Sequence, residues 1–164
     1  MTSNVISASL TNSSLATSKL GEGVEEFGRL KRFRLANLST PIEKLDRLRA
    51  LIPGAPHLYI KRDDLTGYFG GGNKLRKLEY VFADALSKGA TTVITTGSIT
   101  SNLARTTAAV ARRLGLKCEL ILNGGDPKAA HANSRVAELL NVKVHHVISR
   151  EERDLTMDQI ATTL

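Results

Sequence analysis

The sequence predicts an α/β fold, an open parallel twisted sheet flanked by helices. Short apolar segments rich in β-branched residues alternate with longer segments whose apolar residues recur at helical spacing. The connections between them are short, and glycines follow two of the expected helices, where a left-handed cap is needed. Ligands of such sheets bind at the carboxyl ends of the strands, so the loops that follow strands are the first candidates for a site.

The N-terminal part has fewer regular signals. We expect residues 1–28 to be a disordered tail, since residues 1–18 are rich in Ser, Thr and Asn and resemble neither a transit peptide nor a secretory signal. Thr40 followed by Pro41 predicts the capped start of a helix. Residues 58–60 predict a short strand that runs into a polar turn.

From residue 74 onward, strand and helix alternate regularly. Lys74–Lys88 predicts an amphipathic helix closed by Gly89, and Ser149–Glu152 has the spacing of a capping box that begins a last helix. Further strands are expected at residues 92–95, 117–122 and 142–148, and further helices at 102–114 and 132–140. The apolar face of the first helix is expected to contain Leu75, Leu78, Phe82, Ala85 and Leu86, with Asp84 and Lys88 paired on the opposite face.

Composition narrows the classes of function. The 164 residues predict one domain, or one domain with an appendage, and no segment has the apolar length of a membrane span. The net charge of +7 allows an anionic partner, but the basic residues are scattered. With 4% aromatic residues and no Trp, we expect no nucleic-acid partner. Solvated faces and attraction for a small anionic ligand explain the charge at least as well.

Cysteine and histidine usage argues against a metal site. Cys118 is the single cysteine, which excludes an internal disulfide and fits a reducing compartment, so we expect a cytoplasmic protein with Cys118 as a small buried hydrophobe. His145 and His146 are neighbours in an expected strand, so one faces in and one out. They cannot converge on a metal ion, and we interpret them as structural.

The segment Gly70–Lys74 is the sharpest chemical signal. Three glycines place a lysine at the first turn of an expected helix, and glycine permits positive φ and close approach of another group. The helix dipole and partial burial both favour a neutral amine, which can attack a carbonyl carbon. The residues therefore fit a Schiff-base lysine. They also fit a surface lysine after a glycine-rich turn, which is the commoner arrangement.

A second candidate loop, Thr96–Asn102, follows an expected strand and leads into a helix. The unpaired N–H groups there and the helix dipole suit an anion such as a substrate carboxylate. Asn102 could donate to, or accept from, an oxygen on an aromatic cofactor ring. Alternatively, Ser101 or Asn102 simply caps the helix, a role that is compatible with ligand binding.

Taken together, these segments resemble the pyridoxal-phosphate-dependent family of D-cysteine desulfhydrase and 1-aminocyclopropane-1-carboxylate deaminase. The resemblance rests on residues 40–45, 58–67, 71–79, 101–102, 105–109 and 114–118, in the family's order and spacing, and its most specific part is the run Ile60–Glu79. It implies the small domain of the tryptophan synthase beta-like, fold type II enzymes. It also implies that Lys74 is more than a surface lysine.

The resemblance assigns roles residue by residue. Lys74 looks like the lysine that forms a Schiff base with pyridoxal phosphate, and the adjacent Asn73 like a residue that helps to fix the cofactor. Asn102 looks like the residue that contacts the cofactor's ring oxygen. Ser101 looks like part of the substrate-carboxylate site and a possible aid to proton transfer. One departure stands at residues 100–103, which read Thr-Ser-Asn-Leu where the family commonly has Gln-Ser-Asn-His.

The implied function is a lyase or deaminase acting on a small amino acid. D-cysteine would give a 2-oxo acid, ammonia and sulfide, and 1-aminocyclopropane-1-carboxylate would be deaminated. Members of the family are longer and usually dimeric, so we expect a truncated version with little activity alone, and a homodimer at full length. Residues 29–56 are expected to belong to the large domain, 57–148 to the small domain, and 149–164 to the return to the large domain. The alternative is a non-catalytic remnant that binds a partner subunit.

Overall fold

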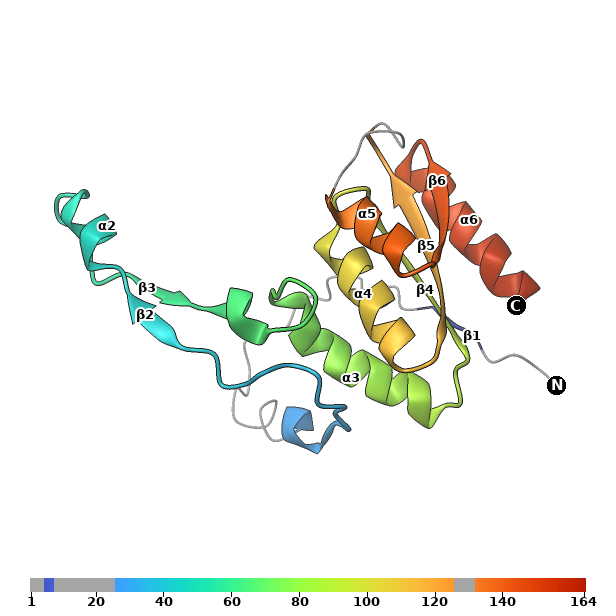
Figure 1. The fold of residues 1–164 in the computed structure, drawn as a ribbon, viewed down its shortest axis with the longest axis horizontal. Helices are drawn as coiled ribbons and strands as arrows, with labels where there is room; N and C mark the ends of the chain where they lie inside the picture. Colours follow the sequence, from blue (N-terminus) through green and yellow to red (C-terminus); the bar gives the residue numbers. More distant parts are fainter. Residues whose placement is uncertain (1–4, 8–25, 126–131) are drawn as a thin grey trace.

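The computed structural model describes residues 5–7, 26–125 and 132–164, and its main sheet is parallel and lies between helices (Figure 1). The four strands run in the order β1 (Val5–Ser7), β4 (Thr92–Ser98), β5 (Lys117–Asn123) and β6 (Lys143–Val147). The pairs β1–β4, β4–β5 and β5–β6 are all parallel, with Thr92 opposite Lys117 and Glu119 opposite Lys143. The predicted α/β fold, an open parallel sheet flanked by helices, is confirmed.

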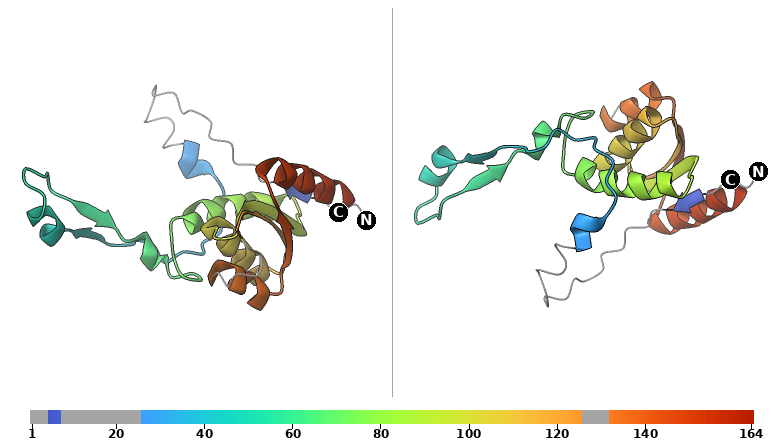
Figure 2. Two further views of the ribbon diagram at one scale, coloured as in Figure 1. Left: turned by 90° about the horizontal axis from the view of Figure 1, so that it is seen from above. Right: turned by 90° about the horizontal axis from the view of Figure 1, so that it is seen from below.

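Helices cover both faces of this sheet (Figure 2). On one face lie α4 (Asn102–Arg113) and α5 (Ala132–Leu139), with α3 (Lys74–Ser87) packed against α4. On the other face lies α6 (Arg150–Thr163), whose start is capped as predicted, because Ser149 Oγ accepts from the backbone N–H of Glu152. Gly89 follows α3 with φ of +71°, the left-handed conformation that the sequence predicts.

The main hydrophobic core lies between the sheet and the layer formed by α3 and α4. It is made by Val93, Cys118, Leu120 and Leu122 from the strands, Leu75, Leu78 and Phe82 from α3, and Ala104, Ala108 and Ala111 from α4. Burial raises the pKa of the Cys118 thiol to about 12, with the nearby Glu119 carboxylate adding to the effect. The thiol therefore stays protonated, and the prediction of a buried hydrophobe is confirmed. Leu86, in contrast, is exposed, although it was expected on the buried face.

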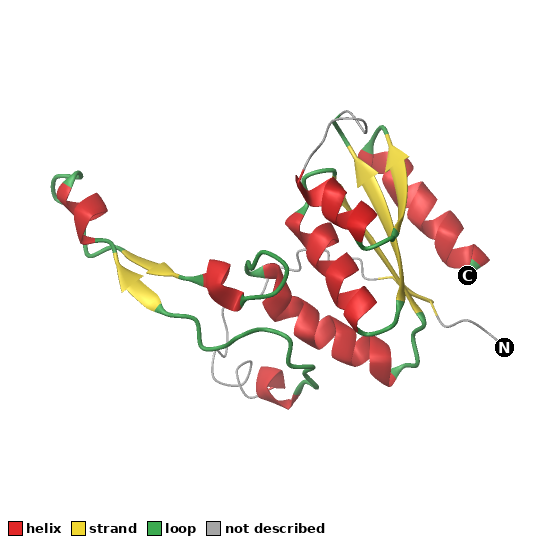
Figure 3. Ribbon diagram, viewed as in Figure 1, coloured by secondary structure: helices red, strands yellow, loops and turns green. Residues whose placement is uncertain are grey.

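The segment expected to begin a helix at Thr40 instead forms a projecting arm (Figure 3). Ile42–Lys44 is strand β2, and it pairs antiparallel with β3 (Tyr59–Lys61) outside the main sheet. Only the five residues of α2 (Asp46–Ala50) are helical. The prediction failed because the β-branched Ile42 has a strand partner in Lys61, and proline leaves the residue before it extended.

The prediction of a disordered tail at residues 1–28 is not met by the residues of this segment that the structure describes. Val5–Ser7 forms β1, which extends the parallel sheet by pairing with Thr92–Ile94, and residues 26–29 form a helical turn. The other residues of the segment 1–25 lie outside the described residues. Within the part of the chain that the structure describes, no helix is both long and apolar enough to cross a membrane. The division of the chain at residues 57 and 149 stays a prediction.

Candidate functional site

The glycine loop before α3 has a backbone that only glycine accepts easily. Gly70, Gly71 and Gly72 have φ of +89°, +68° and +108°, and the preceding Phe69 is also left-handed at +46°. At Gly71, a Cβ atom would lie 2.0 Å from the backbone oxygen of Asp64. The loop therefore passes against the neighbouring turn more closely than any other residue would allow.

Lys74 is the first residue of α3, immediately after this loop. Its side chain is half-buried and makes no hydrogen bond or ion pair within the described residues. Asn73 is the N-cap of the helix but makes no side-chain capping bond and is exposed. One turn further on, burial lowers the pKa of Lys77, and the charge of Lys74 lowers it further. The loop thus presents an unpaired amine at a helix N-terminus, beside a second cation.

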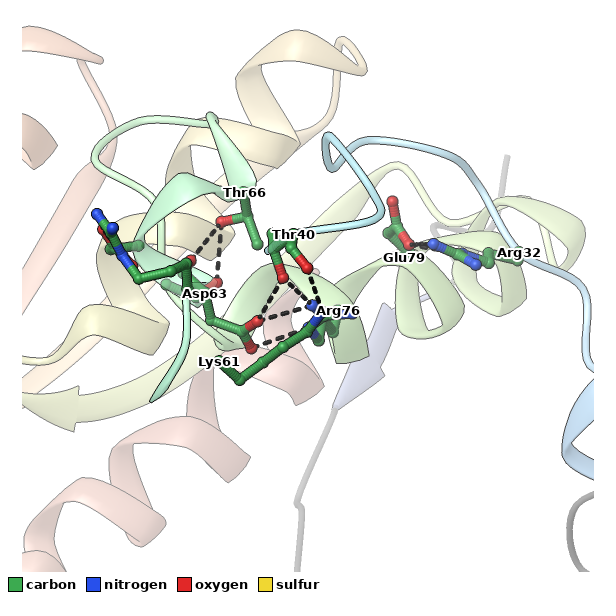
Figure 4. Close-up of polar contacts among 10 residues, drawn as sticks. Arg32, Thr40, Lys61, Asp63, Thr66, Arg76 and Glu79 are labelled. Carbon is green, nitrogen blue, oxygen red and sulfur yellow. Dashed lines mark hydrogen bonds and ion pairs between the residues drawn. The ribbon is translucent and has the colours of Figure 1, made fainter. Parts of the chain in front are cut away.

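An ion-pair network fixes the turn against which the glycine loop packs (Figure 4). Arg76 binds the Asp63 carboxylate with two hydrogen bonds of 2.9 and 2.7 Å, and Thr40 donates to the same carboxylate at 3.2 Å. The hydrogen bonds from Arg76, with help from its charge and from Thr40, hold the pKa of Asp63 below its usual value against the opposing effect of burial. The Asp63 carbonyl accepts from the N–H of Gly72 at 2.7 Å. Arg76 in α3 therefore anchors both sides of the loop.

A second polar cluster in Figure 4 ties an N-terminal segment to α3. Glu79 is fully buried, and one carboxylate oxygen accepts from the backbone N–H groups of Leu35 and Ala36 at 2.6 and 2.7 Å. The other oxygen accepts a hydrogen bond from Arg32 Nε and forms an ion pair with Arg32 Nη2, both at 2.6 Å. Burial alone would raise the pKa of Glu79, but these donors and the Arg32 charge hold it below its ordinary value.

The second candidate loop closes tightly over the end of β4. Ser101 is the N-cap of α4, and its Oγ accepts from the N–H of Ala104 at 3.2 Å. Gly97 makes room for it, since a Cβ there would lie 2.6 Å from the Ser101 side chain. Ser101 is thus a capping residue, as one reading of the sequence predicts. Its hydroxyl proton is not used in this bond and remains available to an acceptor.

Arg105 in α4 brings the two predicted loops together. Its guanidinium donates to the backbone oxygens of Phe69 and Gly71 in the glycine loop. It also donates to Asn102 Oδ1 at 3.3 Å, and Asn133 Nδ2 from α5 donates to the same oxygen at 3.3 Å. The loop that carries Lys74 and the loop that carries Asn102 are therefore joined through one side chain.

The comparison with protein families agrees with this arrangement. The model described as "Pyridoxal-phosphate dependent enzyme" matches residues 33–163, which include both loops. The chain belongs to this family. Family membership also establishes pyridoxal phosphate as the cofactor of the enzymes to which this chain is related, as the sequence predicts.

The individual relatives match this chain over less than half of their own length. D-cysteine desulfhydrases of Salmonella paratyphi B and Salmonella newport are each 39% identical over 141 residues, covering 83% of this chain and 42% of theirs. This chain thus spans about two fifths of the length of the curated relatives it matches.

Solved structures give the same picture. An ACC deaminase homologue has a TM-score of 0.72 at 37% identity, over 80% of this chain and 39% of that chain. A pyridoxal 5'-phosphate-dependent aspartate racemase has a TM-score of 0.59 at 19% identity, over 76% of this chain and 37% of that chain. The latter likeness shows the fold alone.

The described residues fit the cofactor of this family. The half-buried Lys74 amine has no hydrogen bond or ion pair among the described residues that would compete with a bond to an aldehyde carbon. Asn102 lies in the first turn of α4, where backbone N–H groups lack partners within the helix and favour an anion. Lys74 and Asn102 would therefore hold pyridoxal phosphate from two loops, with Asn73 exposed next to them.

Two hollows in the described surface lie elsewhere. One, of about 450 Å³, is on the outer side of α3, lined by Phe27, Arg32, Leu38, Arg76, Lys77, Glu79, Tyr80 and Val81. Another, of about 340 Å³, is at the carboxyl ends of β5 and β6, lined by Gly124, Gly125, His146, Val147 and Ile148. Neither is lined by Lys74 or Asn102, so the chemistry of the loops, and not the size of a hollow, identifies the candidate site.

Sequence patterns missed the residues that connect the loops. Arg105 lies within a motif of the family resemblance that implies no role for it, and Asn133 falls in an expected helix. Both act through contacts between distant parts of the chain, about which local spacing carries no signal. Leu103, at the position where the family commonly has histidine, packs partly buried against the main core.

Proposed function

We propose that this chain provides the lysine-bearing part of a pyridoxal-phosphate-dependent lyase or deaminase. The substrate would be a small amino acid such as D-cysteine, giving a 2-oxo acid, ammonia and sulfide, or 1-aminocyclopropane-1-carboxylate. The observation that carries the proposal is the unpaired Lys74 amine behind a glycine loop that Arg105 joins to Asn102. The identity of 39% to D-cysteine desulfhydrases supports this choice of substrate class.

The side chains divide the work between them. When bound, pyridoxal phosphate supplies the electron sink that stabilises negative charge at the substrate Cα. Lys74 Nζ would hold the cofactor through its aldehyde carbon, and Asn102 would contact its ring oxygen. Ser101 Oγ, fixed by the Ala104 N–H, keeps its own proton for the substrate carboxylate or for a proton transfer. The N-terminal N–H groups of α4 favour the same carboxylate.

Borohydride trapping tests the proposal. The purified chain is mixed with pyridoxal phosphate, reduced and mapped by peptide mass spectrometry. We expect the label chiefly on Lys74, because the other lysines do not follow a glycine loop at the start of a helix. Lys74→Arg, which keeps the charge but cannot form the imine, should abolish that label, whereas Lys77→Arg should leave it. Labelling spread evenly over the surface lysines would contradict the assignment.

The alternative, a non-catalytic chain that binds a partner subunit, has its own support. The arm formed by β2, α2 and β3 is exposed on both strands, and its apolar side chains include Leu51, Ile52 and Tyr59. Isolated two-stranded ribbons are marginally stable, and contiguous exposed apolar surface marks an interaction site. In either case we propose that residues 29–56 pack against a further protein surface. That surface would belong either to the part of the relatives that has no counterpart in this chain, or to a second subunit of a homodimer.

From the exposed apolar residues of the arm we expect this chain to self-associate. Leu51 and Ile52 are 79% and 47% exposed, so replacing both with serine should weaken dimerisation about tenfold or more. Sedimentation velocity across a concentration series measures this. The matched control is Leu139→Ser, which removes an apolar side chain that is 83% exposed in α5, away from the arm. Equal weakening by the control would assign association to general surface hydrophobicity. The cytoplasmic location and the absence of nucleic-acid and membrane partners remain predictions.

A further inference from the structure

Arg105 makes three side-chain hydrogen bonds, two to the glycine loop and one to Asn102 at the start of its own helix. Its Nη1 donates to the Phe69 oxygen, and its Nη2 donates to the Gly71 oxygen at 3.4 Å and to Asn102 Oδ1 at 3.3 Å. The Arg105 side chain also requires glycine at residue 70, since a Cβ there would lie 2.3 Å from Arg105 Nη1. The glycine loop and the guanidinium therefore fit together by shape as well as by hydrogen bonds.

The loop needs such an external partner. Four consecutive residues, Phe69–Gly72, have positive φ, a conformation that a free chain containing glycines would leave readily. The glycines lower the steric cost of the conformation but raise the entropy lost in keeping it. Two carbonyl oxygens of this stretch accept from Arg105, and the N–H of Gly72 donates to the Asp63 carbonyl in the preceding turn.

The same contact fixes which end of the Asn102 amide faces outward. An arginine side chain has donors only, so the Asn102 atom that it contacts must be the oxygen. Asn133 Nδ2 donates to that oxygen as well. Because Oδ1 already has two donors, the Asn102 NH₂ group is the end left for a ligand. The sequence leaves open whether the Asn102 side chain donates to the ligand or accepts from it, and these contacts favour donation.

We propose that Arg105 is a positioning residue that holds the Lys74 loop in register with Asn102 and turns the Asn102 amide to donate to the ligand. The inference rests on the proposed function for the identity of that ligand. It rests on the hydrogen bonds alone for the coupling between the two loops. Arg105 itself touches no reacting atom in this scheme.

Amide hydrogen exchange of the chain without cofactor tests the coupling. The N–H groups of Gly71 and Gly72 are hydrogen-bonded to Tyr68 and Asp63, so they report on the loop directly. Arg105→Lys keeps the charge but cannot fork over three acceptors. We expect exchange at these two amides to accelerate about tenfold and the Asn102 side-chain amide resonance to shift. Arg112→Gln, which removes an exposed charge from the same helix, should change neither.

Each outcome decides the inference. Faster exchange confined to the loop supports it. Unchanged exchange at Gly71 and Gly72 overturns it, and so does faster exchange throughout α3, which would mean that Arg105 only holds the fold together. Borohydride trapping separates this result from the proposed function. Arg105→Lys should lower the label on Lys74 severalfold without affecting other lysines, whereas a wild-type chain with no selective label refutes the function and leaves the exchange result intact.

Discussion

Replacing Glu79 with glutamine is expected to lower the free energy of unfolding by about 3 kcal/mol. The buried carboxylate accepts three hydrogen bonds, two from the backbone of Leu35 and Ala36 and one from Arg32, with which it also forms an ion pair. Glutamine has the same size but offers one oxygen, so its NH₂ group must face a donor on one side. Either the two backbone N–H groups or the guanidinium then lose their acceptor in a buried place. Denaturant unfolding followed by circular dichroism measures the change.

Glu43 provides the matched control. It forms an ion pair with Arg62 at 2.6 Å, but its side chain is 47% exposed. Exposed pairs contribute little, so Glu43→Gln should cost less than about 1 kcal/mol. Similar losses of unfolding free energy for the two variants would show that burial does not strengthen the contacts of Glu79.

Acid should remove the advantage of Glu79 over glutamine. The donors around Glu79 depress the pKa of its carboxyl in the folded state below the value of about 4.5 that it has when unfolded. A depressed pKa contributes stability that is complete above the unfolded value and is lost as pH falls through the folded one. The difference in unfolding free energy between wild type and Glu79→Gln should therefore be constant near neutral pH and narrow below about pH 4.5. A difference that widens on acidification would contradict this account of the site.

Sequence periodicity predicted the sheet and its helices well because each signal was local. The predicted α4 and β5 match the structure to within one residue, whereas β4 runs three residues beyond its predicted end, into the segment expected to be a loop. The same reasoning failed at Ile42–Lys44, where pairing with a segment more than a dozen residues away decided between helix and strand. It also gives no sign that Glu79 is buried, because the backbone donors that allow its burial lie more than 40 residues away.

The candidate site divides in the same way. A glycine run before a helix and a polar loop after a strand are readable in the sequence, and they located Lys74 and Asn102. Their connection is not readable, because Arg105 reaches carbonyl groups 34 and 36 residues away. A family resemblance carries over roles for matching residues, but it does not say which side chain holds two loops at a working distance.

Gly71→Ala is expected to be the most damaging single substitution in the glycine loop, costing about 3 to 5 kcal/mol of stability. Two effects add. Alanine is strained at a φ of +68°, and its Cβ would meet the Asp64 backbone oxygen at 2.0 Å. That oxygen cannot swing aside as a flexible side chain could. It belongs to the turn Asp63–Thr66, which Arg76 and Thr40 hold through Asp63. Thermal unfolding measures the stability.

Gly89→Ala separates the two effects, because Gly89 has nearly the same φ, +71°, with nothing within 4 Å of the added Cβ. It should cost only the conformational term, about 1 to 2 kcal/mol. The excess at Gly71 is then the close approach of two backbones, the feature that places Lys74 behind the loop. Gly71→Ala should also abolish selective borohydride trapping at Lys74, since a displaced loop releases the start of α3. Equal costs at the two glycines would mean that the loop yields to a side chain, and that this packing does not position the lysine.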